Sequence, residues 1–326
     1  MNSLKDRPAL SDLLCVFVQI RLAKVRIMAD PVAEVVSLLK PSPSIAKLVT
    51  GGGQWLVERT ELGSPFYCAV VEGRCLMTIK GRQPMLLTAG DFVLVPEIFS
   101  FTMSSLEPPP RGALAQRLET SPGVFRLGDP NAPAEIKAMV GHCAFGSDDN
   151  ALLVSLLPEV IHISGEERLT LLVQMINDET RANRTAREMV LHRLLEVLLI
   201  EALRSTGGAA APPGLLRGMA DPQLAPTLRR IHEDPGRSMT VEALARDAAM
   251  SRSTFFDRFR KEVGVAPMEY AIGWRMALAK ELLCKDIAMA EIASRVGYGS
   301  TSAFSVAFSR HVGKSPGAYS RSRAPV

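Results

Sequence analysis

The stretch LARDAAMSRSTFFDRFRKEVGVAPMEY, residues 244–270, decides the fold of the C-terminal part of this chain, because its pattern occurs twice. The second copy is IASRVGYGSTSAFSVAFSRHVGKSPGAY, residues 292–319. The offset is 48 residues in the first part of the match and 49 in the rest, which indicates one inserted residue at the turn. Apolar anchors, a Gly and a Pro at repeated distances predict one supersecondary unit used twice. The matched pairs are Leu244 and Ile292, Ala245 and Ala293, Ala249 and Gly297, Phe255 and Phe304, Phe259 and Phe308, Gly264 and Gly313, Pro267 and Pro316, and Tyr270 and Tyr319.

Each copy reads as a helix, a short turn, a second helix and an exit loop. In the first copy, Ser251 is suited to cap a second helix over residues 252–263. Phe255 and Phe259 share one face of this helix and are expected to point into the core. The segment 268–284 joins the copies, and as a helix it spans about 25 Å, which suits two recognition helices about 34 Å apart on DNA. The pattern therefore predicts a tandem helix-turn-helix, which is typical of DNA-binding proteins.

Charge favours a polyanionic partner for this part of the chain. Residues 222–326 hold 16 Lys and Arg against 10 Asp and Glu, a net charge of +6, whereas residues 1–221 have a net charge of −2. A basic domain is the electrostatic footprint of a DNA-binding protein, although an ordinary solvated surface is the alternative for its arginines. The candidate DNA-binding residues are those left on the outer face of each second helix, namely Arg252, Ser253, Phe256, Asp257 and Arg260, and Thr301, Ser302, Ser305, Val306 and Arg310.

Four motifs in this region, MSRSTFFDRFRKEVG, WRMALA, IASRVGY and SPGAY, resemble the AraC/XylS family of bacterial transcription regulators. The resemblance covers residues 222–321 and implies binding of double-stranded promoter DNA through both units, with RNA polymerase as a candidate partner. Two positions depart from the family, which often has Arg or another polar donor at Asp257 and Val306. Asp accepts a hydrogen bond from cytosine but repels phosphate, and Val offers only apolar contact, as to a thymine methyl group.

The preceding part of the chain is predicted to be rich in β-structure. Residues 47–126 read as short strands separated by turns that contain glycine, such as Glu72-Gly73 and Ala89-Gly90-Asp91. Strands at this spacing favour an all-β sandwich or barrel. Helices are expected on both sides of these strands, over residues 32–39, 169–176 and 189–201.

We therefore expect an α+β multidomain protein with one clear linker. The segment from Thr206 to Gly214 is uncharged and rich in Gly, Ala and Pro, as a domain boundary should be. Met28 is a candidate natural start, so the residues before it are treated as an extension. The expected segments are an extension of unknown status (1–28), a β-rich sensor and dimerisation domain (29–206), the linker (207–221) and the helix-turn-helix domain (222–326).

The β-rich region also carries a resemblance. Gly63, Glu72 and Gly81, followed by Gly90 and Pro96, resemble the two motifs of the cupin barrel. Their spacing fits the sensor domain found ahead of the helix-turn-helix pair in one AraC subgroup. The resemblance implies a cupin-like β-barrel with flanking helices.

The positions that hold a metal ion in this fold lack histidine here. Metal-binding cupins use His residues on facing strands, and those positions hold Tyr67 or Cys68 in the first motif and Phe101 in the second. We therefore expect no metal, no cofactor and no enzymatic activity. What remains is a barrel whose mouth can hold a small-molecule effector. Candidate lining residues are Trp55, Tyr67, Cys68 and Phe101, for each of which an ordinary core position is the alternative.

Cys68, Cys75 and Cys143 are candidate oxidation sensors. Arg74 and His142 adjoin two of them, and a neighbouring cation lowers the pKa of a thiol. Buried, inert thiols are the alternative. Five scattered cysteines without a CxxC pair indicate a reducing compartment. No apolar run near the start is long enough to span a membrane, so we expect a soluble cytoplasmic protein without a membrane partner.

The helix expected over residues 189–201 is apolar around much of its circumference. Such a helix is usually buried on two sides, and Leu191, Leu195 and Leu198 are therefore candidates for a homodimer contact. Burial inside its own domain is the alternative.

Three functional hypotheses fit the sequence. The favoured one is a dimeric transcription regulator that binds promoter DNA in sequence-specific fashion and responds through its barrel to a small-molecule effector or an oxidant. The second is an effector-independent DNA-binding protein with a structural barrel. The third is a cupin enzyme with a DNA-binding appendage, which the missing metal ligands disfavour.

Overall fold

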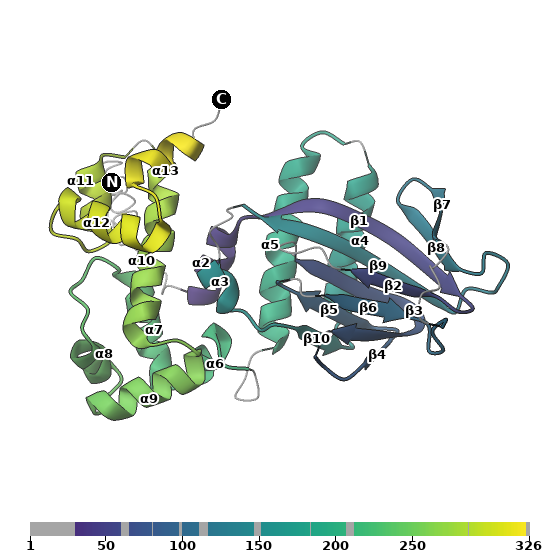
Figure 1. The fold of residues 1–326 in the computed structure, drawn as a ribbon, viewed down its shortest axis with the longest axis horizontal. Helices are drawn as coiled ribbons and strands as arrows, with labels where there is room; N and C mark the ends of the chain where they lie inside the picture. Colours follow the sequence, from purple (N-terminus) through teal and green to yellow (C-terminus); the bar gives the residue numbers. More distant parts are fainter. Residues whose placement is uncertain are drawn as a thin grey trace, which may run out of the picture.

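A computed structural model of the chain has a β-rich part with flanking helices and an all-helical part, which lie side by side (Figure 1). The α+β multidomain prediction is confirmed. The predicted extension, Gly63 and residues 207–211 of the predicted linker lie outside the described residues. The structure describes residues 30–59, 65–79, 81–97, 100–110, 117–146, 151–182, 184–206, 212–285 and 287–323.

The strands of the β-rich part range from 4 to 14 residues in length. The predicted turn at Ala89-Gly90-Asp91 is confirmed, because Ala89 and Gly90 separate two strands that each pair with a third strand, and Asp91 begins the second of them. The described strands are β1 (Pro41–Gly52), β2 (Leu56–Arg59), β3 (Phe66–Ile79), β4 (Met85–Thr88), β5 (Asp91–Val95), β6 (Phe101–Ser104), β7 (Arg117–Ser121), β8 (Val124–Gly128), β9 (Ile136–Phe145) and β10 (Ile161–Ser164).

These strands form one strongly curled sheet. Its main path runs in the order β10-β5-β3-β9-β1-β8-β7, and β4 and β6 also pair with β3, while β2 pairs with β6. Strand β1 pairs with β8 in parallel, whereas β3 is antiparallel to all four of its described neighbours. The curl encloses a concave inner face, which is the cupin-like feature that the sequence resemblance implied.

Strand β3 continues through Glu72 and Gly73, where we predicted a turn between two strands, and that prediction is wrong. Its register with β9 shifts between Val70 and Glu72, and Gly73 has a φ of 76°. These residues form a β-bulge, which adds one residue to the strand and thereby exchanges its two faces. Cys68 before the bulge and Cys75 after it consequently both face the inner cluster of the curled sheet.

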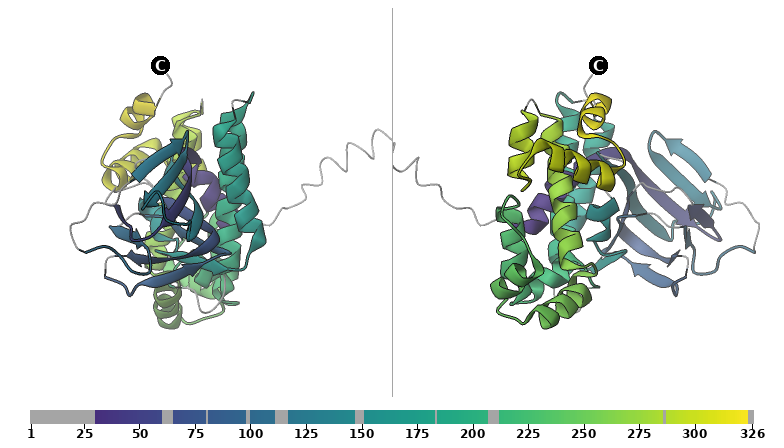
Figure 2. Two further views of the ribbon diagram at one scale, coloured as in Figure 1. Left: turned by 90° about the vertical axis from the view of Figure 1, so that its right-hand side faces the viewer. Right: turned by 60° about the vertical axis from the view of Figure 1, so that its left-hand side comes forward.

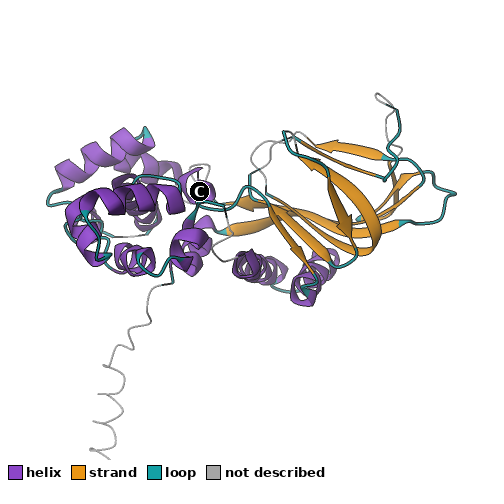
Figure 3. Ribbon diagram, turned by 90° about the horizontal axis from the view of Figure 1, so that it is seen from below, coloured by secondary structure: helices purple, strands orange, loops and turns teal. Residues whose placement is uncertain are grey.

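Helices α4 (Glu167–Arg181) and α5 (Arg187–Thr206) lie against one face of the sheet and are seen end-on beneath the strands in Figure 3. Leu191, Leu195 and Leu198 of α5 are only 3%, 1% and 1% exposed within this single chain. Their predicted role as dimer contacts is therefore wrong. Helix α5 is broadly apolar because it packs against α4, β1 and β10 at once.

Helix α2 (Pro31–Leu39) confirms the helix predicted near the start of the β-rich part. Asp30 caps it by accepting a hydrogen bond from the backbone N–H of Val32 at 3.0 Å. Together with the short α3 (Ala151–Ser155), it lies between the two parts of the molecule (Figure 1).

The all-helical part begins earlier than predicted. Leu215, which we placed in the linker, is buried and opens a helix, because it packs into the core beneath the helix-turn-helix domain. The second half of the predicted linker is thus structured. The helices of this part are α6 (Leu215–Ala220), α7 (Leu224–Glu233), α8 (Val241–Asp247), α9 (Arg252–Val263), α10 (Pro267–Leu283), α11 (Met289–Arg295), α12 (Thr301–Val312) and α13 (Pro316–Arg323).

The sequence repeat is reproduced in the geometry of the two units. Ser251 caps α9 by accepting a hydrogen bond from the backbone N–H of Thr254. Ser300 caps α12 in the same way, by accepting one from the backbone N–H of Ala303. Gly264 and Gly313 end these helices with φ values of 88° and 78°. Within each helix the two Phe rings have centroids 5.5 Å apart and are fully buried. The predicted tandem helix-turn-helix is confirmed.

The two units differ in what they pack against. The core of the first unit is continuous with the apolar cluster formed by α2, α4, α5 and the sheet, whereas the second unit has its own cluster around Phe304 and Phe308. Figure 2 shows the two helical groups stacked along α10, which contacts helices of both units. The first unit is therefore tied to the β-rich part, and the second is carried by α10.

A buried histidine lies at the contact between the two parts. His232 of α7 has Nδ1 2.8 Å from the Glu34 carboxylate of α2, and Nε2 2.6 Å from the Tyr270 hydroxyl. Its ring also stacks on Trp274 with centroids 3.8 Å apart. A neutral ring satisfies both contacts, with Nδ1–H donating to the carboxylate and Nε2 accepting from the hydroxyl.

This contact predicts a loss of stability in acid. Burial lowers the pKa of His232, against the opposing effect of Glu34. The unfolded chain then binds more protons than the folded one, so the free energy of unfolding falls as pH drops below the unfolded pKa of about 6.5. We expect the melting temperature to fall between about pH 7.5 and about pH 5.5, and to fall less in His232→Gln. An equal fall in both proteins would show that His232 does not control this dependence.

The two turns give a second prediction about stability. Ala249 has a φ of 53°, whereas its counterpart Gly297 has 83°. Ala249→Gly is expected to stabilise the protein by about 0.5–1 kcal/mol, because relief of left-handed strain exceeds the added entropy of the unfolded chain. The reverse change, Gly297→Ala, should destabilise it by more than about 1 kcal/mol, since its Cβ would lie 2.6 Å from Arg275 Nη2. Urea denaturation of both variants tests this, and destabilisation by Ala249→Gly would contradict it.

Candidate DNA-contact surface and sheet pocket

Helix α9 has one buried face and one exposed face. Phe255 and Phe259 are fully buried, and Phe259 makes an edge-to-face contact with Tyr270 of α10, with centroids 5.8 Å apart. This packing fixes the rotation of the helix and so determines which side chains face outward. On the outer face, Phe256 is half-buried and the other predicted residues are exposed, namely Arg252, Ser253, Asp257 and Arg260.

Arg252 is the most prominent cation at the start of α9. Its Nε lies 2.9 Å from Glu242 Oε1 of α8, and its side chain is 70% exposed. An exposed ion pair of this kind contributes about 0–1 kcal/mol to stability. It therefore orients the guanidinium but is weak enough for another anion, such as a phosphate, to replace the carboxylate. Arg258, by contrast, bonds to Asp221 at 2.6 Å and to Gln223 at 2.7 Å, and therefore anchors α9 to the segment after α6.

Helix α12 repeats this arrangement with a less charged outer face. Phe308 contacts Tyr319 edge-to-face, with centroids 5.7 Å apart, as Phe259 contacts Tyr270. Val306 is 71% exposed, which is unusual for a large apolar side chain on a helix. Of the other predicted residues, Ser305 is half-buried, and Thr301, Ser302 and Arg310 are exposed.

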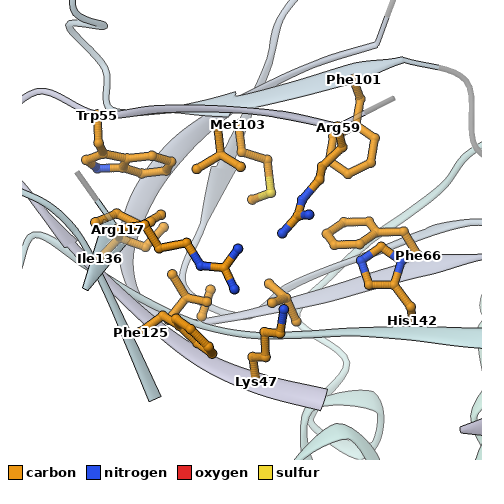
Figure 4. Close-up of a pocket in the computed structure, with 15 residues that line it drawn as sticks. Lys47, Trp55, Arg59, Phe66, Phe101, Met103, Arg117, Phe125, Ile136 and His142 are labelled. Carbon is orange, nitrogen blue, oxygen red and sulfur yellow. The ribbon is translucent and has the colours of Figure 1, made fainter. Parts of the chain in front are cut away.

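A pocket opens on the concave face of the curled sheet (Figure 4). Side chains alternate between the two faces of a strand, so every second residue reaches this pocket. It opens to solvent at its mouth. Lining residues are Lys47 and Val49 of β1, Val57 and Arg59 of β2, Phe101 and Met103 of β6, Phe125 and Leu127 of β8, and Ile136, Ala138, Val140 and His142 of β9, with Trp55, Phe66 and Arg117.

Half of the predicted lining is found in this pocket. Trp55 and Phe101 line it, but Tyr67 and Cys68 do not. Tyr67 follows Phe66 and so points to the other face of β3, where it packs over Gly141 at the paired position of β9. Cys68 shares the inner face but is fully buried in the deeper cluster.

The pocket has four polar residues that our sequence analysis missed, Lys47, Arg59, Arg117 and His142. Three of them stand in phase with apolar lining residues of the same strand, as in Lys47 and Val49, Val57 and Arg59, or Val140 and His142. Arg117 is the one described residue of β7 that lines the pocket, so no such pattern marks it. The alternation of faces along each strand is the signal that would have found Lys47, Arg59 and His142.

The three candidate redox cysteines lack the environment of a reactive thiol. Burial raises the pKa of Cys75 and of Cys143 to about 12, and raises the pKa of Cys68 well above its usual value. The neighbours that suggested activation, Arg74 and His142, lie on the opposite faces of their strands because successive side chains alternate. The structure therefore contradicts the prediction of an oxidation sensor at these thiols.

A metal centre does not fit the residues at the cupin ligand positions. Tyr67 faces away from the pocket, Cys68 is fully buried in the apolar inner cluster, and Phe101 has no ligand atom. Among the residues that the structure describes, there is no group of three or more His, Cys, Asp or Glu that could hold a metal ion. Within the same residues, no helix is both long and apolar enough to cross a membrane.

Comparison with known proteins agrees with this two-part architecture. A cupin family model matches residues 30–206, and a helix-turn-helix domain model matches residues 244–322. An AraC-like transcription regulator of Streptomyces antibioticus is 35% identical over 305 residues, which are 91% of this chain and 100% of that protein. Another from Streptomyces lividans is 34% identical over 89% of this chain and 97% of that protein.

Among solved structures, the DNA-binding domain of the global transcriptional factor AdpA, in complex with a target DNA, has 36% sequence identity and a TM-score of 0.29. The match covers 31% of this chain and 92% of that one. Identity of 34–35% over nearly the full length of the two Streptomyces proteins, together with the cupin and helix-turn-helix matches, decides the family. The chain belongs to the AraC-like transcription regulators, with an N-terminal cupin domain and a C-terminal helix-turn-helix domain that binds DNA.

Proposed function

We propose that this regulator binds its operator as a homodimer, places α9 and α12 of each chain in successive major grooves, and responds to a small molecule held in the sheet pocket. The observation that carries the proposal is the exposed outer face of each recognition helix, fixed in rotation by two buried Phe rings. RNA polymerase stays a predicted partner.

The spacing of the two recognition helices is supported by the rigidity of α10. This helix has 17 residues, as the sequence pattern predicted. Arg275, near its middle, donates hydrogen bonds to the backbone carbonyls of Pro235 at 2.8 Å and Arg237 at 2.6 Å. These bonds hold α10 to the loop between α7 and α8, so the first unit is fixed on the spacer.

Base readout is expected mainly from α9. Its outer face has two exposed arginines, Arg252 and Arg260, and Arg pairs well with guanine in the major groove. The outer face of α12 has Val306, which suits a thymine methyl group, and hydroxyls that suit phosphate or shape recognition.

The homodimer is proposed to form through the outer faces of α4 and α5. With the buried leucines of α5 excluded, these helices still expose several large apolar side chains on the side away from the sheet. Apolar side chains gathered in one region of a surface commonly mark a protein contact, and a second copy offers the same face in a symmetric pair. The exposed apolar residues of these two helices are Leu171 and Met175 of α4, and Met189, Val190 and Val197 of α5, whose exposed fractions lie between 38% and 68%.

The effector proposal is favoured over a purely structural sheet by the open pocket. A structural core would fill the concave face with apolar side chains, but this one opens to solvent and is lined in part by charged groups. The pocket lies on one face of the sheet, and the opposite face shares one continuous core with α2 and the first helix-turn-helix unit. Movement of the strands around a bound molecule is therefore proposed to reach the DNA-binding domain through the sheet.

Arg252→Ala tests DNA readout. If Arg252 contacts a base, the variant should lose about 1–3 kcal/mol of affinity at defined operator positions and become indifferent to the base there. Operators obtained by genome-wide footprinting, each mutated at single positions, provide the measurement. Arg82→Ala is the matched control, since Arg82 is a 50% exposed arginine in the turn between β3 and β4, paired with Glu159 and outside the recognition helices and the proposed dimer face. An equal loss on every sequence would assign Arg252 to phosphate, and no loss would remove it from the interface.

A double change, Leu171→Glu with Met175→Glu, tests the dimer. Two carboxylates on the exposed face of α4 should leave the fold intact but abolish association, which sedimentation velocity would detect as a shift to monomer. Leu118→Glu is the control, because Leu118 is a 55% exposed residue on β7, away from these helices. A double variant that sediments unchanged would exclude this face.

A further inference from the structure

The ion pair between α8 and α9 joins the two helices of the first unit near the start of each. Thr240 caps α8 by accepting a hydrogen bond from the backbone N–H of Ala243 at 3.1 Å, and Glu242 follows in the first turn. Arg252 is the first residue of α9. Its Nε lies 2.9 Å from Glu242 Oε1, and the two side chains are 70% and 55% exposed. The two charged groups therefore meet on the outer surface of the domain.

The second unit lacks both members of this pair. With the offsets of the sequence repeat, Glu242 corresponds to Ala290 and Arg252 corresponds to Thr301. Both units nevertheless have the same caps, the same buried Phe pair and the same terminal Gly. The fold of a unit thus does not require the ion pair. A role in what the first unit contacts is the better explanation.

The contact through Nε leaves the far edge of the guanidinium for another partner. Nε is the nitrogen next to the aliphatic part of Arg252, so Nη1 and Nη2 form the opposite edge. Two parallel N–H donors on that edge match the O6 and N7 acceptors of guanine in the major groove. The first residues of a recognition helix are those that contact base edges. Arg252 therefore has both the position and the donors to bind guanine.

The carboxylate also disfavours a phosphate as the partner of Arg252. A hydrogen bond from its own backbone N–H, together with the charge of Arg252, lowers the pKa of Glu242 against the opposing effect of desolvation, so the group is ionised at neutral pH. A carboxylate repels a phosphate oxygen, whereas guanine presents neutral acceptors. Bound DNA excludes water, which strengthens the attraction between two close opposite charges. The ion pair should therefore be stronger in the complex than in the free protein.

We propose that Glu242 is a positioning residue for base readout, which holds the guanidinium of Arg252 toward a guanine and away from the phosphate backbone. The inference rests on the proposed base readout by α9. A long side chain that is already held in one place loses less conformational freedom when it binds. Holding it also opposes the rearrangement by which a free guanidinium reaches a phosphate, and so increases the preference for guanine.

Glu242→Gln in the full-length chain tests the proposal, because it keeps the shape of the side chain and removes its charge. An operator is first selected from random double-stranded oligonucleotides, and the base that loses its influence in Arg252→Ala is located. Fluorescence anisotropy then gives the affinities for all four bases at that position. We expect a guanine there, and we expect Glu242→Gln to reduce the preference for it by about two- to tenfold. Affinity for random-sequence DNA should stay equal or rise, because one negative charge is lost.

The same change in the Arg252→Ala background shows whether Glu242 acts through Arg252. There we expect Glu242→Gln to leave the base preference at every operator position unchanged. A change of preference in this background would mean that Glu242 itself contacts a base. In the chain with Arg252, an equal change of affinity on all four bases would mean that Glu242 only repels DNA, and a stronger preference for guanine would mean that it restrains Arg252. Each of these three outcomes would overturn the proposal.

Glu291→Gln is the matched control. Glu291 lies in the first turn of α11 and is 52% exposed, but it pairs with Arg295 of its own helix. The control removes the same charge from the equivalent helix of the second unit, so it accounts for the charge of the domain and for the loss of an anion near a helix start. We expect it to leave the preference at the base read by Arg252 unchanged. A reduction equal to that in Glu242→Gln would also overturn the proposal.

These measurements separate the role of Glu242 from the proposed function. If Arg252→Ala relaxes the preference at one base but Glu242→Gln does not, readout by Arg252 stands and the role of Glu242 is wrong. If Arg252→Ala weakens binding equally on all sequences, Arg252 contacts phosphate and both proposals are wrong.

Discussion

Helix α10 is the constraint on which the DNA-binding domain depends. It belongs to both helix-turn-helix units, since Tyr270 near its start closes the first core and its second half packs in the core of the other unit. Arg275 fixes it to the first unit, and Glu281 near its end is paired with Lys40, just beyond α2. A helix has a fixed rise per residue, so the length of α10, together with the packing of each unit against it, sets the distance between the two recognition helices.

The curled sheet obeys a different constraint, the alternation of side chains along each strand. One face packs under α4 and α5, and the other forms the pocket, so neighbouring residues in the sequence serve separate purposes. The bulge at Glu72 and Gly73 shows how sensitive this division is. One additional residue exchanges the two faces for the remainder of β3, and the inner cluster is built from residues on both sides of it.

The helical domain could be predicted from the sequence because its signals are local. Phe pairs four residues apart, serine caps and terminal glycines specify each unit within about thirty residues. The sheet pocket could be predicted only in part, because it is assembled from strands far apart in the chain, and their register depends on a bulge that reads as a turn. Trp55 and Phe101 were identified, but the cations were not. The prediction that the leucines of α5 form a dimer contact was wrong for a similar reason. A sequence does not show how many other helices and strands of the same chain pack against a helix.

The unequal packing of the two units bears on how such regulators can be recombined. Because the first unit and the cupin domain share a core, a chimaera that joins this DNA-binding domain to a foreign sensor at the Gly- and Pro-rich segment would cut through packed apolar surface. The second unit, with its separate cluster, could be exchanged without that damage. New operator specificity is therefore easier to acquire by replacing residues of α12 than by transplanting the whole domain.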